Sequence, residues 1–151
     1  MTREDYQRTG AVNGNPLDRL PLRPIAIDLF AGAGGLSLGF EQAGFDVVAS
    51  VEYDPVHAAI HAYNFPQTVV LCRDVAELRA DELRLAVING LATHGHSIDH
   101  WDGEVDIIFG GPPCQGFSTM GKRLIEDTRN QLVFHFFRII SQLLSLIHIS
   151  E

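Results

Sequence analysis

Four short apolar runs, each followed by a segment of helical character, constrain the fold of this chain more than any other feature. We expect strands at 25–30, 45–52, 68–71 and 105–109, alternating with helices at 36–43, 54–63, 81–91 and from about 130 onward. Strands and helices that alternate at this spacing form a parallel sheet with right-handed crossover connections. The sequence therefore predicts an α/β fold built on a doubly wound parallel sheet.

Capping residues and apolar spacing define these helices. Gly44 follows the first helix, where a glycine in the left-handed conformation commonly ends a helix. Asp54 and Pro55 begin the second helix, as an N-cap carboxylate followed by a proline at the first helical position. We expect apolar faces on the last two helices, formed by Leu83, Val87, Ile88 and Leu91 and by Leu132, Val133, Phe136, Phe137, Ile139 and Ile140.

The composition is typical of one globular domain. The 151 residues are 46% hydrophobic and 20% charged, and we see no signal peptide or membrane-spanning apolar stretch. Cys72 and Cys114 lie far apart, so we expect free thiols, a cytoplasmic location and no membrane association. His94, His96 and His100 have no cysteine or HExxH partner nearby, and we interpret residues 92–104 as a polar loop rather than a metal site.

The charge balance limits what this segment can bind. The formal net charge is −8, with 11 Lys and Arg against 19 Asp and Glu. Because phosphate contacts are made mainly by Lys and Arg, this balance argues against a grip on nucleic acid by this segment alone. Residues 1–23 are polar, contain Gly and Pro, and lack a sustained apolar period, so we expect a flexible N-terminal arm.

A glycine-rich turn, Ala31-Gly32-Ala33-Gly34-Gly35, follows the first strand. Its glycines let backbone N–H groups and the start of a helix approach a ligand without obstruction by side chains. A strand, a glycine turn and a helix in this order form the nucleotide-binding opening of a Rossmann-like sheet, which binds ligands at the carboxyl ends of its strands.

Acidic and aromatic residues stand at these same strand ends. Glu52 is placed to accept hydrogen bonds from both hydroxyls of a ribose, and Asp74 can accept one from an adenine amino group. Phe30 and Tyr53 offer flat surfaces for an adenine and a sulfonium cation. NAD and S-adenosylmethionine both carry the ribose, but Ser37 stands where the third glycine of a dinucleotide fingerprint would be.

The fourth strand leads into Gly110-Gly111-Pro112-Pro113-Cys114-Gln115-Gly116-Phe117-Ser118. Two prolines stiffen the backbone before the cysteine, and the flanking glycines permit close approach to a ligand. This rigid setting at the end of a buried strand favours a functional role for Cys114 over that of a small buried hydrophobic residue.

These motifs, in this order, make the chain resemble the DNA cytosine-C5 methyltransferases over roughly residues 25–143. The resemblance rests on the run from Asp28 to Gly35, on Glu52-Tyr53-Asp54 and on the run from Gly111 to Ser118. It implies an enzyme that transfers a methyl group from S-adenosylmethionine to C5 of cytosine in double-stranded DNA, acting as a monomer when complete. Restriction-modification is one role that this implies, and regulation or phage defence stays open.

The resemblance also assigns site residues. It implies a cofactor-binding set of Phe30, Ala31, Gly32, Gly34, Gly35, Glu52, Tyr53, Asp74 and Pro112. It implies that Cys114 is the catalytic nucleophile; from the lack of a metal-binding signature we expect no metal site. A loop that closes over the DNA would carry Gln115, Ser118, Lys122, Arg123 and Arg129.

The chemistry explains why a thiol is required. C5 of cytosine is too electron-poor to attack a methyl sulfonium directly. Addition of the Cys114 thiolate to C6 gives an enamine whose C5 is nucleophilic; after methylation a base removes the C5 proton and the thiolate leaves. Because the target base lies inside the duplex stack, it must first be flipped out into the site.

Several features of the family are missing from this sequence. No Glu-Asn-Val motif occurs, and the arginine-rich motif, the target recognition domain and the late helix of the cofactor pocket are absent. We therefore expect 24–144 to be a partial catalytic domain, truncated after the fourth strand and its following helix and inactive or nearly so alone. Residues 145–151 resemble translated sequencing-adapter read-through, and our hypothesis is that they are a non-native tail.

Three alternatives stay open at this point. An RNA cytosine-C5 methyltransferase of the same superfamily would carry a similar Pro-Pro-Cys-Gln motif. A non-catalytic S-adenosylmethionine-binding module would fit the truncation. A nicotinamide-dependent dehydrogenase would share the fold, but it predicts a glycine near Ser37 and gives Cys114 no role.

Overall fold

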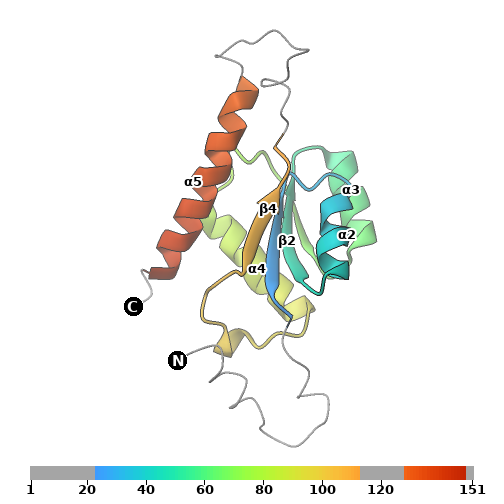
Figure 1. Cartoon of the computed structure of the whole chain (residues 1–151), viewed down its shortest axis with the longest axis vertical. Helices are drawn as coiled ribbons and strands as arrows, with labels where there is room; N and C mark the ends of the chain where they lie inside the picture. The colour runs from blue at the N-terminus through green and yellow to red at the C-terminus, as the bar shows by residue number, and fades with distance from the viewer. Residues whose placement is uncertain (1–22, 113–127, 149–151) are drawn as a thin grey trace, which may run out of the picture.

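A four-stranded parallel sheet forms the centre of the protein, as the computed structural model shows for residues 23–112 and 128–148 (Figure 1). The strand order is β3-β2-β1-β4. The strands are β1 (Ile25–Leu29), β2 (Asp46–Glu52), β3 (Val69–Cys72) and β4 (Ile107–Gly110). The helices are α2 (Gly35–Gln42), α3 (Pro55–Asn64), α4 (Ala80–Thr93) and α5 (Thr128–His148), with a 3-10 turn, η2, at Ile98–His100. The predicted α/β fold with a parallel sheet is confirmed.

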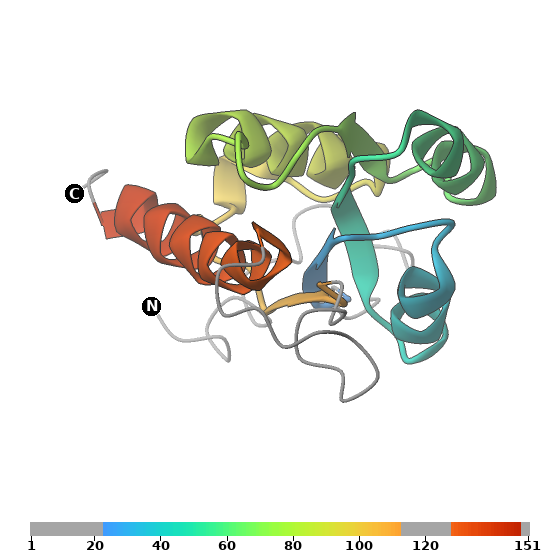
Figure 2. The same cartoon turned by 90° about the horizontal axis from the view of Figure 1, so that it is seen from above.

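Helices cover both faces of the sheet. Helices α2 and α3 contact β1, β2 and β3 from one side, and α4 contacts β2 and β3 from the other side, where α5 packs beside it (Figure 2). Strands β1 and β2 are therefore almost wholly buried, with Ile27, Leu29 and Val51 fully inaccessible. Burial on two faces explains why these strands read as continuous apolar runs instead of alternating ones.

The main hydrophobic core lies between the sheet and the helix pair α4 and α5. Leu83, Val87 and Leu91 from α4 are buried in it, as predicted, and Ile139 from α5 joins them. The predicted apolar face of α5 is wrong at Phe137, whose side chain is largely exposed. A smaller cluster on the opposite face of the sheet includes Phe109, whose ring stacks on that of Phe40 in α2.

The predicted helix caps are present. Gly44 has a φ of 95°, in the left-handed region that ends α2. Asp54 Oδ1 accepts hydrogen bonds from the backbone N–H groups of Val56 and His57, at 2.9 Å each, and Pro55 is the first residue of α3. The hydrogen bond from His57 N–H is the main reason that the pKa of Asp54 is lowered.

Other boundaries differ from those predicted. Strand β4 begins at Ile107 and not at Val105, although Asp106 still binds Ile25 through the Asp106 N–H and a carboxylate oxygen. The predicted loop at 92–104 contains the end of α4 and the 3-10 turn. Helix α5 begins at Thr128 and continues through His148, so part of the hypothesised tail is helical; its non-native origin stays a hypothesis.

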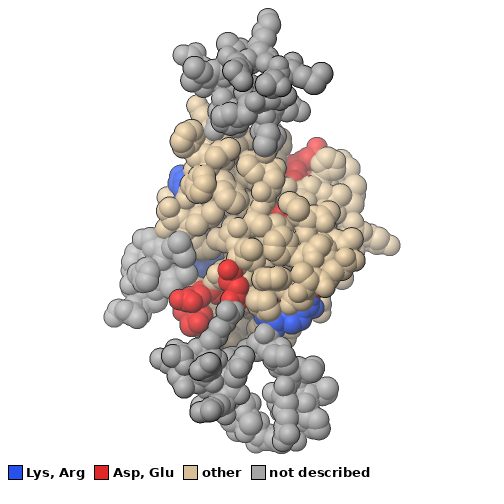
Figure 3. All heavy atoms as spheres, in the orientation of Figure 1, with Lys and Arg blue, Asp and Glu red and all other residues tan. Residues whose placement is uncertain are grey.

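Two surface properties of the described residues bear on function. Among them, no helix is long and apolar enough to cross a bilayer. The face in Figure 3 is mostly uncharged, with small separate groups of acidic and basic side chains. No continuous basic surface is visible on this face among the coloured residues.

Candidate functional site

The parallel sheet brings the ends of all four strands to one edge. Leu29 pairs with Val51 on one side and with Gly110 on the other, and Glu52 pairs with Cys72. The glycine turn, Tyr53, Asp74 and Pro112 follow these paired residues along the chain. The segments predicted to bind the cofactor therefore share this edge, at the upper end of the sheet in Figure 1.

The glycine turn folds back over the end of β2. Phe30 has a φ of 66°, a left-handed conformation that is uncommon for an aromatic residue and is often found where a backbone is shaped for function. The Ala31 N–H then donates to Val51 O at 3.0 Å, and the Gly34 N–H donates to Ala31 O at 3.0 Å. This strained corner fixes the path of the turn above the sheet.

The glycines of the turn serve different purposes. A Cβ on Gly34 would lie 2.2 Å from Cε2 of Phe65, and its φ is 102°, so packing and backbone conformation both require a glycine there. Cβ atoms on Gly32 or Gly35 would meet no atom of a described residue within 4 Å. Within the glycine turn, Gly32 and Gly35 therefore leave open space beside the backbone.

Glu52 is held against the turn by backbone groups. Its Oε2 accepts a hydrogen bond from the Gly32 N–H at 2.7 Å, and its Oε1 accepts one from the Asp54 N–H at 2.8 Å. A carboxylate oxygen has two lone pairs, so each oxygen retains capacity for a further donor. The half-buried carboxylate is thus oriented and still able to accept hydrogen bonds from two hydroxyl groups.

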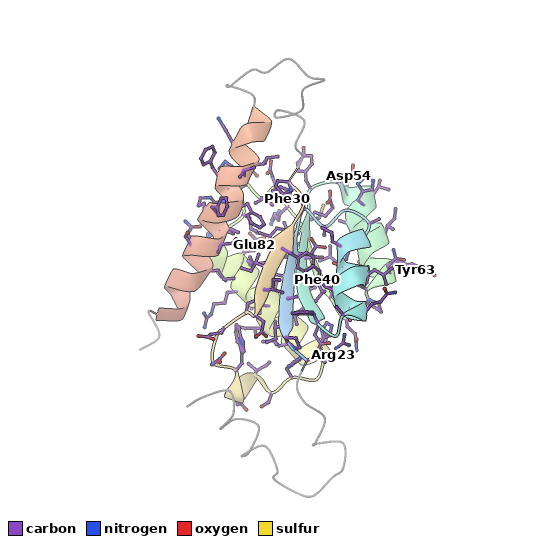
Figure 4. The ribbon with its side chains drawn as sticks, in the orientation of Figure 1. Arg23, Phe30, Phe40, Asp54, Tyr63 and Glu82 are labelled. Atoms are coloured by element: carbon purple, nitrogen blue, oxygen red, sulfur yellow. The ribbon has the colours of Figure 1, made fainter. Side chains whose placement is uncertain are left out.

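The two predicted aromatic residues lie in different environments. The Phe30 ring is partly buried and stacks on Phe136 of α5, with 6.4 Å between ring centroids. Tyr53 is 72% exposed, which leaves its ring surface available to a ligand. Figure 4 shows Phe30 and Asp54 near one end of the sheet and Arg23 near the opposite end.

Asp74 shapes the loop between β3 and α4. Its Oδ1 accepts a hydrogen bond from the Ala76 N–H at 2.8 Å, and its carbonyl accepts from Glu77 and Leu78. This local bond turns the chain at the end of β3 and uses one carboxylate oxygen. The other oxygen has no hydrogen bond that involves another described residue, so a ligand amino group could reach it.

Sequence reasoning missed Arg138, which secures this same loop. From α5 its guanidinium donates to the carbonyl oxygens of Val75 at 2.8 Å, Ala76 at 3.3 Å and Leu78 at 3.2 Å. A single arginine within the apolar run of the last helix was the signal that could have identified it.

A buried polar cluster lies beneath the glycine turn. Of its members, the sequence analysis considered only Ser37 individually. Asp28, Ser37, Ser50 and His61 are all fully inaccessible to solvent. Ser37 Oγ donates to Asp28 Oδ2 at 2.7 Å and lies 3.1 Å from His61 Nε2, and Ser50 Oγ lies 3.4 Å from His61 Nδ1. Ser37 stands where a dinucleotide fingerprint has its third glycine. Because its side chain points into the core and not toward the glycine turn, it does not by itself exclude a dinucleotide. Polar residues inside apolar strand runs were the available signal.

Residues 92–104, which we interpreted as a polar loop, also contain two histidines that contact carboxylates. His94 Nε2 lies 3.8 Å from Glu41 Oε1, and His96 Nε2 lies 2.7 Å from Asp46 Oδ2. Arg23 contacts Asp46 Oδ1 at 3.2 Å and Glu41 Oε2 at 3.5 Å. The two histidines belong to a network with these two carboxylates, at the end of the sheet opposite the glycine turn.

The remaining predicted site residues fall largely outside the described part of the chain. Cys114, Gln115, Ser118, Lys122 and Arg123 lie outside the described residues. Arg129 is in α5, but its side chain is not described. The structure therefore describes the cofactor half of the predicted site.

Comparison with known proteins decides the family. The sequence model of the C-5 cytosine-specific DNA methylase family matches residues 25–145. The chain belongs to this family. Its resemblance to the DNA cytosine-C5 methyltransferases, inferred from the glycine turn and the Pro-Pro-Cys-Gln motif, is thereby confirmed.

Individual methylases show how much of a relative this chain represents. It is 53% identical over 121 residues to the type II methyltransferase M.XorII of Xanthomonas oryzae, covering 80% of this chain and 26% of the relative. It is 42% identical to M1.HphI of Haemophilus parahaemolyticus, covering 76% and 28%. A crystal structure described as a DNA modification methyltransferase encoded within an E. coli prophage is 41% identical with a TM-score of 0.58, covering 80% and 29%. The chain thus spans between a quarter and a third of these relatives' length.

Proposed function

We propose that this chain provides the S-adenosylmethionine-binding part of an enzyme that methylates C5 of cytosine in DNA. The observation that carries the proposal is the contact between the Gly32 N–H and Glu52 Oε2 at 2.7 Å. This contact joins the glycine turn to an oriented carboxylate, the two parts that a ribose-bearing cofactor requires at this edge of a parallel sheet. Membership of the C-5 cytosine-specific DNA methylase family supports the choice of cofactor.

The residues present fit this cofactor. Open space beside Gly32 and Gly35 admits a ligand to the backbone, and Glu52 retains lone pairs for ribose hydroxyls. The exposed ring of Tyr53 can pack on an adenine, and Asp74 can accept from its amino group. When bound, S-adenosylmethionine supplies an electrophilic methyl group.

We propose that Cys114 is the nucleophile of the complete enzyme. Its thiolate forms a bond to C6 of a flipped cytosine, which makes C5 nucleophilic. C5 then takes up the methyl group, with S-adenosylhomocysteine as the leaving group; a base removes the C5 proton, and the C6–S bond breaks to release the thiolate. Gln115, Ser118, Lys122, Arg123 and Arg129 would contact the DNA from the following segment. Pro112, two residues after the end of β4, would hold the segment with Cys114 beside the cofactor.

Calorimetric titration with S-adenosylmethionine, with NAD as a control ligand, tests the cofactor assignment. We expect S-adenosylmethionine alone to bind. Glu52→Gln replaces the charged acceptor by a neutral amide and should weaken binding about tenfold or more, because hydrogen bonds to charged groups contribute about 1.5–3 kcal/mol.

Glu104→Gln is the matched control for this titration. Glu104 is exposed, precedes β4 and lies outside the proposed site, so its replacement should leave affinity unchanged. Binding of NAD, equal affinity of the Glu52→Gln variant, or a folded chain that binds neither ligand would each contradict the proposal for this chain.

A further inference from the structure

Four buried polar groups form a hydrogen-bond chain of fixed direction beneath the glycine turn. Ser37 has one hydroxyl proton, and it donates this proton to Asp28 Oδ2 at 2.7 Å. The 3.1 Å contact between Ser37 Oγ and His61 Nε2 must then be donated by the imidazole Nε2–H. In a neutral imidazole Nδ1 is consequently the acceptor, and Ser50 Oγ donates to it at 3.4 Å.

The net electrostatic effect at His61 favours the neutral ring, although the nearby Glu52 carboxylate acts in the opposite direction and raises the pKa of His61. Burial lowers the pKa of His61, which keeps the imidazole neutral. Burial raises the pKa of Asp28 to about 6, with an opposing effect of the Ser37 hydrogen bond and a further rise from the Glu52 carboxylate. Asp28, His61 and Glu52 are the titratable groups that these electrostatic effects involve, from β1, α3 and β2.

These hydrogen bonds link the elements that carry the predicted cofactor site. Asp28 stands two positions before Phe30, and Ser37 lies in the first turn of α2, directly after the glycine turn. Ser50 stands two positions before Glu52, and His61 reaches in from α3. The four side chains therefore connect both sides of the glycine turn to the strand that ends in Glu52.

Apolar packing alone would not explain this cluster. Burying polar groups is costly unless their hydrogen bonds are satisfied, and Asp28 Oδ1 has no partner among the described residues. A set of apolar side chains could fill the same volume without this cost. Directional hydrogen bonds, in contrast, fix the relative position of the elements that they join.

We propose that Ser37 and His61 are positioning residues, which set the conformation of the glycine turn and the orientation of Glu52 for the cofactor. The inference deepens the proposed function and rests on it for the identity of the ligand. Its structural part, control of the turn, can be measured without any ligand.

Residue-resolved hydrogen exchange by NMR tests that structural part. In the His61→Leu and Ser37→Ala variants, we expect the amides of Gly32 and Gly34 to exchange about tenfold faster or more, since the turn loses its support. Amides of Leu83 and Val87 in α4 should keep their wild-type rates. A uniform rise at all amides, or no change at Gly32 and Gly34, would overturn the proposal.

A conservative variant and a control sharpen the comparison. His61→Gln keeps one donor and one acceptor, so it should restore exchange at Gly32 and Gly34 to within about threefold of wild type. His57→Leu removes an exposed histidine from the same helix and should change neither amide. If Gly32 and Gly34 exchange as fast in His61→Gln as in His61→Leu, the hydrogen bonds of His61 do not hold the glycine turn in place.

Nitrogen-15 NMR of the His61 imidazole tests the direction of these hydrogen bonds in the wild-type protein. We expect a neutral His61 ring with a proton on Nε2 and none on Nδ1 at about pH 7.5, above the ordinary pKa of a histidine. The opposite tautomer would overturn the assigned direction of the chain and the proposal with it.

Calorimetry separates this inference from the proposed function. In His61→Leu and Ser37→Ala the dissociation constant for S-adenosylmethionine should rise about tenfold or more with stoichiometry unchanged. A lower stoichiometry with an unchanged dissociation constant would indicate only partial unfolding and would overturn the positioning role. If the wild-type chain shows the expected exchange pattern but binds no S-adenosylmethionine, the turn is controlled as proposed and the cofactor assignment is wrong.

Discussion

Single residues decide how closely the backbones approach around the site. A Cβ on Gly110 would lie 1.8 Å from Leu29 O, and one on Gly90 would lie 1.9 Å from Val48 O. The first glycine lets β4 run beside β1 at the site edge, and the second lets α4 lie directly against β2. Asp28 also matters as a single residue, because its carboxyl group has no access to solvent and burial disfavours its charged form.

The pH dependence of stability should report on Asp28. Its pKa is about 6 in the folded protein against 3.8 for an ordinary aspartate, so the folded state binds the proton more tightly than the unfolded state. Its contribution is therefore most favourable below pH 3.8 and is lost as the pH rises through about 6. Relative to Asp28→Asn, wild type should lose about 3 kcal/mol of unfolding free energy over this range.

Urea unfolding at intervals between about pH 3 and pH 7, a range that brackets the two pKa values, measures this difference. Asp99→Asn, at an exposed aspartate in the 3-10 turn, is the control for loss of one carboxylate from the surface. A constant difference between wild type and Asp28→Asn across the range would show that Asp28 has the same proton affinity folded and unfolded.

Among the elements, α5 reaches several distant parts of the chain. Its Phe136 stacks on Phe30, Ile139 enters the core, and Arg138 binds the carbonyls of the loop after Asp74. This one helix therefore braces two of the predicted cofactor-binding segments. Its long apolar run predicted a packed helix, but which segments it would brace depended on how it crosses the sheet.

Arg138→Met should lower the free energy of unfolding by about 1.5–3 kcal/mol, the range for hydrogen bonds to charged groups. Methionine keeps most of the apolar stem, but the carbonyls of Val75, Ala76 and Leu78 lose their donor. Urea denaturation measures the change. Arg79→Met, at an exposed arginine paired with Asp81, should change stability by less than about 0.5 kcal/mol. Equal effects of the two variants would contradict a special role for Arg138.

At the scale of the whole molecule, the negative net charge argues against DNA binding by this segment alone. The net charge is −8, and Figure 3 shows basic side chains only in small separate groups on the face it presents. Because Lys and Arg make most contacts to phosphates, we expect most of the DNA-binding surface of a complete enzyme to lie outside this segment. The chain spans only 26% of M.XorII, which leaves ample room for such a surface in a complete enzyme.

We expect this 151-residue chain to show no binding to duplex DNA at about 10 μM in about 0.15 M salt, because even basic proteins bind DNA nonspecifically with dissociation constants of only about 10⁻⁴–10⁻⁶ M. Fluorescence anisotropy of a labelled duplex measures this. Micromolar binding that weakens steeply as salt is raised would show that the segment does carry phosphate contacts.

The sequence alone determined the alternation of strands and helices, the caps at Gly44 and Asp54, and the edge of the sheet where ligands would bind. These features depend on apolar spacing and on capping bonds between residues a few positions apart, which a local pattern contains. Glu52 and the glycine turn were predicted on the same grounds, and their roles toward a cofactor stay predictions.

Only the tertiary structure decided which polar atoms meet. Gly32 and Glu52 are 20 residues apart, and Arg138 and Val75 are 63 apart, yet each pair is joined by a hydrogen bond, of 2.7 Å and 2.8 Å respectively. The chain from Asp28 through Ser37 and His61 likewise joins separate elements. Such bonds require atoms to be placed within a few tenths of an ångström, and that placement is set by how helices pack on the sheet and not by any local pattern.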